Sequence, residues 1–72
     1  MNKYITAYDN DTFYGYRVSI QKKGIVITKY FSSTKLGDKN AKNMAIAYRD
    51  NLLAALKSCQ TSEEVLEVRN NF

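Results

Sequence analysis

Two β-prone segments that meet at a two-residue turn shape the first half of this chain. From residue 13 to about residue 22, the side chains alternate as they do along a half-buried strand. One side of this strand carries Tyr16, Val18 and Ile20, and the other carries Arg17, Ser19 and Gln21. Lys23-Gly24 supplies the turn, because Gly24 accommodates a positive φ. We therefore expect an antiparallel hairpin with one buried face and one face of hydrogen-bonding groups.

Two further strands are predicted around this one. Tyr4-Ile5-Thr6-Ala7-Tyr8 is β-prone, and Asp9-Asn10-Asp11 ends it, because Asn and Asp bond their own backbone in turns. Residues 25–31 form the third strand, whose two faces are mixed. Ile25, Ile27, Lys29 and Phe31 share one parity, and Val26, Thr28 and Tyr30 share the other. This mixture predicts a bulge or an edge position, with Phe31 in the core.

A helix is predicted over residues 40–58, after a polar connection from residue 32 to 39 in which Asp38 or Asn40 acts as the N-cap. Steps of three and four place an apolar stripe on this helix. The stripe consists of Ala41, Ala45, Tyr48, Leu52, Ala55 and Cys59, widened by Met44, Leu53 and Leu56. Thr61 and Glu64 fit a capping box that begins a second short helix over about residues 62–70. The alternative is a continuation of the first helix, since neither Gly nor Pro separates the two.

The expected fold class is α+β, in one domain that spans residues 1–72. A three-stranded antiparallel sheet over about residues 3–32 packs against the long helix. Tyr16, Val18 and Ile20 should then face Ala45, Tyr48 and Leu52. A chain of this length buries only about 60% of its unfolded surface, so the core is small.

The composition argues against an enzyme and against a metal or cofactor site. There is no His, and Cys59 is the single cysteine, which removes the usual general base and a structural zinc site. The three glycines stand far apart, so they do not form a phosphate-binding loop. Asp9-Asn10-Asp11 lacks the further ligands of a calcium loop and is better explained as a turn.

The expected location is the cytoplasm, with no membrane contact. One cysteine cannot form an intramolecular disulfide, which a small secreted domain usually needs. The first residues show no apolar run typical of a signal peptide, and no stretch reaches the roughly 18 apolar residues of a membrane span.

The charge distribution favours a polyanionic partner. Residues 1–42 hold eight Lys and Arg against three Asp, a net charge of +5, whereas residues 43–72 carry −1. Arg17, Ser19 and Gln21 would project in a row about 7 Å apart, and Arg and Gln can bond base edges or phosphates. Lys22, Lys23 and Lys29 add charge near the hairpin. The alternative is that any exposed antiparallel sheet carries such polar residues.

The sequence resembles the AP2 (integrase-type) DNA-binding domains, particularly their small bacterial and phage members. The resemblance covers about residues 3–57. It rests on Gly15-Tyr16-Arg17-Val18-Ser19-Ile20, Lys29-Tyr30-Phe31, Lys35-Leu36-Gly37, and the segment from Asn40 to Leu56 with Ala45, Ala47-Tyr48-Arg49-Asp50 and Leu52-Leu53. The resemblance implies that the sheet enters the DNA major groove. The chain departs from the family in carrying a single Arg and no Trp on its strands.

The predicted function is that of a small DNA-binding accessory protein, related to phages or mobile elements by the resemblance. The predicted contacts to double-stranded DNA are Thr6, Tyr8, Arg17, Ser19, Gln21, Lys22, Lys23, Thr28 and Lys29. The alternative is a module that docks on a protein partner, such as a nucleoprotein complex, through an exposed edge formed by Ile25, Val26 and Ile27. Burial of Ile25 or Ile27 across a two-fold axis would give a homodimer.

Overall fold

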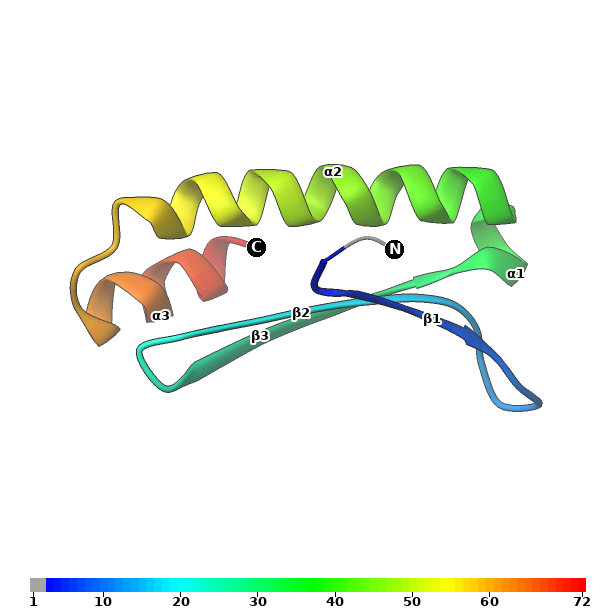
Figure 1. Cartoon of the computed structure of the whole chain (residues 1–72), viewed down its shortest axis with the longest axis horizontal. Coiled ribbons are helices and arrows are strands. Elements are labelled where there is room, and N and C mark those ends of the chain that lie inside the picture. The colour runs from blue at the N-terminus through cyan, green and yellow to red at the C-terminus, as the bar shows by residue number, and fades with distance from the viewer. Residues whose placement is uncertain (1–2) are drawn as a thin grey trace.

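A three-stranded antiparallel sheet lies against a layer of helices in the computed structural model, which describes residues 3–72 (Figure 1). Along the chain the elements are β1 (Ile5–Asp9), β2 (Tyr14–Lys22), β3 (Ile25–Ser32), α1 (Ser33–Leu36), α2 (Asp38–Lys57) and α3 (Ser62–Asn71). The strand order is β1-β2-β3, so the central strand is β2. The long helix α2 runs above the sheet, and α3 folds back beneath its C-terminal end (Figure 1). The predicted α+β fold is confirmed.

The strands pair in a continuous register. Ile5 lies opposite Val18 in the β1–β2 pair, and the β2–β3 pairing runs without interruption from Gly15 opposite Ser32 to Lys22 opposite Ile25. The third strand is therefore a regular edge strand, so the predicted edge position is confirmed and the predicted bulge is not needed. At the hairpin tip, Lys23 and Gly24 both have positive φ, 53° and 77°. Such turns match the twist of the flanking strands.

The core lies between the sheet and the helices. It consists of Ile5, Val18, Ile20, Ile27, Phe31, Ala41, Ala45, Leu52, Leu56, Cys59 and Val65. Tyr16 and Tyr48 are partly buried and pack against this core, which confirms that the Tyr16, Val18 and Ile20 side of β2 faces α2. Met44, predicted to widen the helix stripe, is instead 46% exposed.

The junction between β3 and α2 differs from the prediction. The segment expected to be a loop contains α1, and Gly37, with φ 84°, is the N-cap of α2 in place of Asp38 or Asn40. Both side chains are engaged elsewhere. The Asp38 carboxylate accepts hydrogen bonds from side-chain hydroxyls of Tyr14, Tyr16 and Ser33, and the Asn40 amide donates to the Leu36 carbonyl at 3.1 Å.

The break before α3 and its capping box are confirmed. The Thr61 hydroxyl accepts from the Glu64 backbone N–H at 3.2 Å, and the Glu64 carboxylate accepts from the Thr61 backbone N–H at 3.1 Å. Val65 of α3 is fully buried. The short helix thus closes the core at the hairpin end of the sheet. Within residues 3–72, no helix has the length and apolar character needed to cross a membrane.

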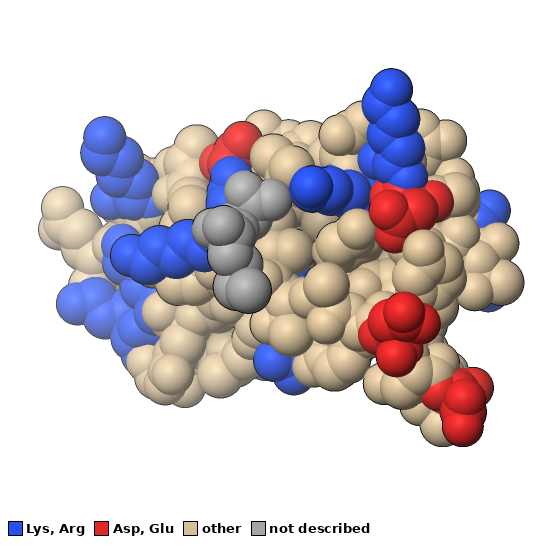
Figure 2. Space-filling model, turned by 45° about the vertical axis from the view of Figure 1, so that its right-hand side comes forward, with Lys and Arg blue, Asp and Glu red and all other residues tan. Residues whose placement is uncertain are grey.

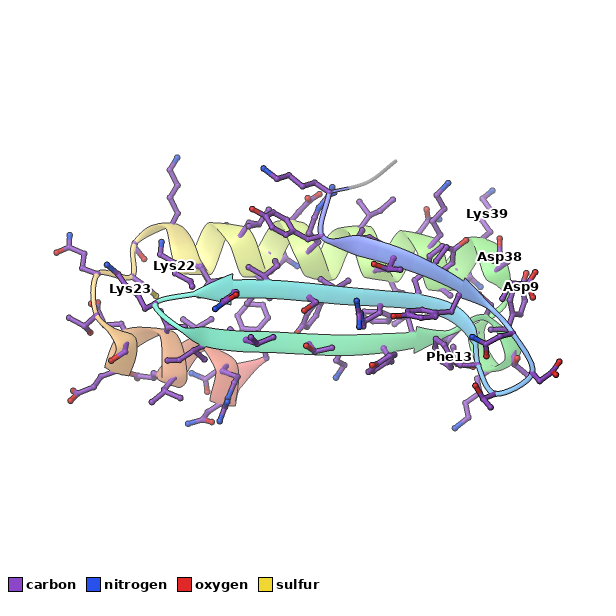
Figure 3. The ribbon with its side chains drawn as sticks, turned by 60° about the horizontal axis from the view of Figure 1, so that its bottom comes forward. Asp9, Phe13, Lys22, Lys23, Asp38 and Lys39 are labelled. Carbon is purple, nitrogen blue, oxygen red and sulfur yellow. The ribbon has the colours of Figure 1, made fainter. Side chains whose placement is uncertain are left out.

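Charged side chains are unevenly distributed over the surface. Figure 2 shows carboxylates gathered towards the end that carries the β1–β2 turn, and Lys and Arg spread over the other side and along the top. Asp9 and Asp38 lie together at this end, and Lys22 and Lys23 lie at the opposite end of the sheet (Figure 3). Lys39 lies beside Asp38 (Figure 3), and Glu63 and Glu64 begin α3 at the hairpin end (Figure 1), so both ends of the molecule carry charges of both signs.

Candidate nucleic-acid interface

One face of the sheet, here called the outer face, points away from α2 and is not covered by any helix within residues 3–72 (Figure 3). The register fixes its members. Thr6 lies opposite Arg17, which lies opposite Tyr30; Ser19 lies opposite Thr28, and Gln21 opposite Val26. Tyr8 and Gly15 complete the set. The structure therefore brings Thr6, Tyr8, Arg17, Ser19, Gln21 and Thr28, all predicted contact residues, to one surface.

Three aromatic rings form a cluster at the end of the outer face next to the β1–β2 turn. Phe13, from the turn, stands edge-on to Tyr8 of β1 and to Tyr30 of β3, with ring centroids 6.1 Å and 5.5 Å apart. These separations and the steep interplanar angles, 66° and 86°, are those of favourable edge-to-face pairs. This aromatic cluster (Tyr8, Phe13 and Tyr30) spans the sheet from one edge strand to the other.

The position of Phe13 depends on Gly15. A Cβ atom at Gly15 would lie 2.9 Å from the Cζ atom of Phe13 and would collide with the Phe31 carbonyl oxygen. Only a residue without a side chain leaves room for the ring at this point of the sheet. Tyr30, at the other side of Phe13, keeps 56% of its surface exposed.

Arg17 lies next to the aromatic cluster at the centre of the outer face. Its guanidinium carbon is 5.5 Å from the centroid of the Tyr8 ring, a cation–π distance. Its Nε atom is buried and has no hydrogen-bond partner within the described residues. Within the described residues the ion pair joins Arg49 to Asp50, and no carboxylate pairs with Arg17. The Arg17 side chain is therefore positioned by the Tyr8 ring. This geometry leaves the guanidinium available to an anionic or carbonyl ligand.

The other half of the outer face is polar and uncharged. The hydroxyls of Ser19 and Thr28 are 3.3 Å apart across β2 and β3, within hydrogen-bonding distance. Gln21 is exposed beyond them, opposite Val26, which is 49% exposed. Short hydroxyl and amide side chains of this kind can bond phosphates or base edges.

The predicted lysines are divided between the two sides of the sheet. Lys23 lies in the turn at the hairpin tip. Lys22 lies on the helix side, where its Nζ donates to the Leu56 carbonyl at 2.6 Å. Lys29 is exposed and shares the parity of the core residues Ile27 and Phe31, so it also lies on the helix side. Arg17 and Lys23 are thus the predicted cations that belong to the outer face and its rim.

The predicted protein interface is largely buried, which corrects the expectation of an exposed apolar edge. Ile27 is 3% exposed because the register places it opposite Ile20, on the helix side. Ile25 is partly buried and packs against the core. Val26 alone of the three is exposed, on the outer face. Ile27 is therefore not free to be buried across a two-fold axis, whereas Ile25 keeps part of its surface exposed, and the homodimer stays a prediction.

A hydroxyl–carboxylate cluster at the start of α2 was missed by the sequence analysis. One oxygen of Asp38 accepts from the hydroxyls of Tyr14 at 3.2 Å, Tyr16 at 3.0 Å and Ser33 at 3.2 Å. The Asp38 charge is the main cause that raises the pKa of Tyr14, whereas burial is the main cause that raises the pKa of Tyr16. The cluster ties β2 to the start of α2. Tyr14 and Tyr16 are two residues apart on a strand and so point to the same side of the sheet. This spacing is the sequence signal that could have indicated the cluster.

Two hollows are formed by the described residues. A hollow of about 280 Å³ lies beside Phe13 and Tyr14, and another of about 250 Å³ lies between α2 and α3. Within residues 3–72, no three His, Cys, Asp or Glu side chains are grouped so that they could hold a metal ion.

Comparisons of the chain with protein-family models, with curated proteins and with solved structures give no match.

Proposed function

We propose that this protein binds DNA through the outer face of its sheet. The observation that supports this proposal best is the open face itself, with Arg17 at its centre and hydrogen-bonding side chains in register beside it. A sheet of this width suits the major groove of duplex DNA. Arg17 offers a planar fork for guanine or phosphate, and Ser19 and Thr28 offer hydroxyls. The role of an accessory protein in a phage or mobile element rests on the AP2 resemblance.

The number of cations on this face sets the expected salt dependence. Arg17 and Lys23 can neutralise two phosphates, so log K should fall with log salt with a slope of about −2. This shallow slope implies that hydrogen bonds and ring contacts supply much of the affinity. Diffuse attraction to the whole basic chain would give a steeper slope.

Fluorescence anisotropy with a labelled duplex, measured between 50 and 200 mM salt, tests the proposal. Arg17→Ala should weaken binding by about 10- to 100-fold, because each bidentate contact contributes about 1–3 kcal/mol. Lys57→Ala is the matched control, since Lys57 is an exposed cation in the last turn of α2. Equal losses for both variants would show attraction without a defined face.

A second candidate is docking on a protein partner, such as a component of a nucleoprotein complex. It is favoured by the composition of the outer face, because Tyr, Phe and Arg are enriched at the centres of protein interfaces. Val26 and Tyr30 add exposed apolar surface, 49% and 56%. Affinity capture after nuclease treatment separates the two candidates. A partner retained by the wild type and lost by Tyr30→Ala would favour docking over DNA binding.

A further inference from the structure

The aromatic cluster points to a particular form of the nucleic acid. We infer that the outer face binds single-stranded DNA, with an unpaired base stacked on the Tyr30 ring and the phosphates running from there towards Lys23. This inference rests on the proposed function and specifies its ligand. In a duplex the flat faces of the bases are hidden by stacking, and a protein reads only their edges. A single strand exposes those faces to aromatic rings.

Tyr30 is arranged as a platform for a base. More than half of its surface, 56%, is exposed. Phe13 contacts Tyr30 nearly at right angles, 86°, with the centroids 5.5 Å apart. Phe13 is itself fixed between Tyr8 and Gly15, so the support of the Tyr30 ring is built into the fold. A ring held in place before binding loses less conformational freedom when a base stacks on it.

Arg17 is placed to act together with this ring. It lies directly opposite Tyr30 in the β2–β3 register, and its guanidinium is held against Tyr8 on the other side. The guanidinium thus lies on the β1 side of the same face, where it could bond a carbonyl or a phosphate of a strand whose base stacks on Tyr30. Stacking rings with an adjacent Arg are the combination used for single strands without strong sequence preference.

The charges at the two ends give the strand a direction. Asp9 and Asp11 lie at the turn beside the aromatic cluster, where Lys35 lines the same hollow as Asp11, so two carboxylates outnumber one cation and disfavour phosphates there. Lys23 lies at the opposite end of the same face. The path between them passes the Ser19–Thr28 hydroxyl pair, which can donate to phosphates. Arg17 is five residues before the end of β2 at Lys22, and Lys23 follows in the turn, so the two cations are at most about 20 Å apart at ~3.3 Å per residue, enough for a short site of about four nucleotides.

The test compares a labelled 15-nucleotide oligo-dT with the same strand annealed to oligo-dA, by anisotropy on the full chain at 50 mM salt. The wild type should bind the single strand at least about 10-fold more tightly than the duplex. Tyr30→Leu, which keeps bulk but removes the π-face, should weaken single-strand binding by about 5- to 100-fold, the range for one lost base–aromatic stack. Tyr30→Phe should bind like the wild type. Met44→Ala, an exposed side chain on α2, should also leave binding unchanged. Circular dichroism verifies that each variant is folded.

The contrary outcomes are distinct. Tight duplex binding with weak single-strand binding would overturn the stacking inference and leave DNA binding in place. Single-strand binding that is equal for wild type and Tyr30→Leu would also overturn it, because the ring would then not be used. Failure of both ligands to bind at 50 mM salt would overturn the inference and the proposed function together, and would favour the protein partner.

Discussion

The two faces of the sheet are formed by the same strands, but they differ in how far their side chains are buried. On the helix side, Val18 and Ile27 are sealed by Leu52 and its neighbours, and nothing further is needed to complete the packing. On the outer face, Tyr30 contacts Phe13 and the Arg17 guanidinium lies over the Tyr8 ring. The comparison shows that this small domain completes its core with one face alone. The rings of the aromatic cluster on the other face lie outside that core.

The sharpest way to break the helix-side packing is Leu52→Ala. Leu52 is 0% exposed in the C-terminal half of α2, and its truncation leaves a cavity between helix and sheet. We expect a loss of about 3–5 kcal/mol in the free energy of unfolding, measured by urea denaturation. Val26→Thr on the outer face is the control and should change stability by no more than about 0.5 kcal/mol. Similar losses for both variants would contradict the division into a sealed and an open face.

Gly15→Ala tests the position where β2 lies close to both the Phe31 backbone and the Phe13 ring. The added Cβ would collide with the Phe31 carbonyl and displace the Phe13 ring. Stability should fall by about 1–3 kcal/mol, and the upfield-shifted ring signals of the aromatic cluster should change in NMR spectra. Gly24→Ala, where a Cβ atom meets no atom within 4 Å, separates steric collision from the strain of a positive φ. If the NMR signals of the aromatic cluster are unaltered in Gly15→Ala, the packing of Phe13 against Gly15 is wrong.

The capping box begins α3, which packs on the helix side of the sheet, and its loss should lower stability less than Leu52→Ala does. Thr61→Ala should lower the free energy of unfolding by about 1 kcal/mol, because the Glu64 N–H loses its acceptor.

Hydrogen bonds from the Gln60 backbone and the Thr61 hydroxyl and backbone hold the pKa of Glu64 below its usual value of 4.5. The resulting stabilisation is present above pH 4.5 and is lost as the pH falls through the lowered pKa of the folded state. Thermal melts between pH 6 and 2 should show this loss, and Glu64→Gln should reduce it. A melt that is equally pH-dependent in Glu64→Gln would exclude this carboxylate as the cause.

The smallest expected effect concerns the two tyrosines bonded to Asp38. Asp38→Asn should lower the pKa of Tyr14 more than that of Tyr16, because the Asp38 charge dominates the first shift and burial dominates the second. NMR titration of the tyrosine ring carbons above pH 8 measures both values. Since both pKa values are raised in the folded state, the stabilisation is complete below pH 10.0 and declines as the pH rises through the raised values. Equal changes in the two tyrosines would show that burial contributes little to Tyr16.

The sequence predicted the parts of the fold that depend on local patterns. Alternation along β2, the Lys23-Gly24 turn and the Thr61–Glu64 capping box are short-range features, and the structure confirms them. The cap of α2 was mispredicted, because the partners of Asp38 are tyrosines 22 and 24 residues away. The buried position of Ile27 follows from pairing with Ile20, which the mixed pattern of the third strand did not reveal.

The candidate site was predicted less completely than the fold. Alternation identified Arg17, Ser19 and Gln21 as neighbours on one face, and the register agrees. The aromatic cluster could not be predicted, because Phe13 precedes its strand and reaches the outer face only through the folding of the turn. The lysines were treated as one group, although Lys22 is drawn to the helix side by the carbonyl of Leu56.

The hydrogen bond from Lys22 to Leu56 has a mechanical consequence. It joins the base of the β2–β3 turn to the last turn of α2, two places that are 34 residues apart in the chain. The hairpin therefore cannot swing away from the helix as a free arm without stretching this contact. A load applied at the tip of the hairpin would pass into α2 and then, through the short connection after Lys57, into α3. The hairpin end of the sheet is thus tied to α2 by a side-chain contact as well as by core packing.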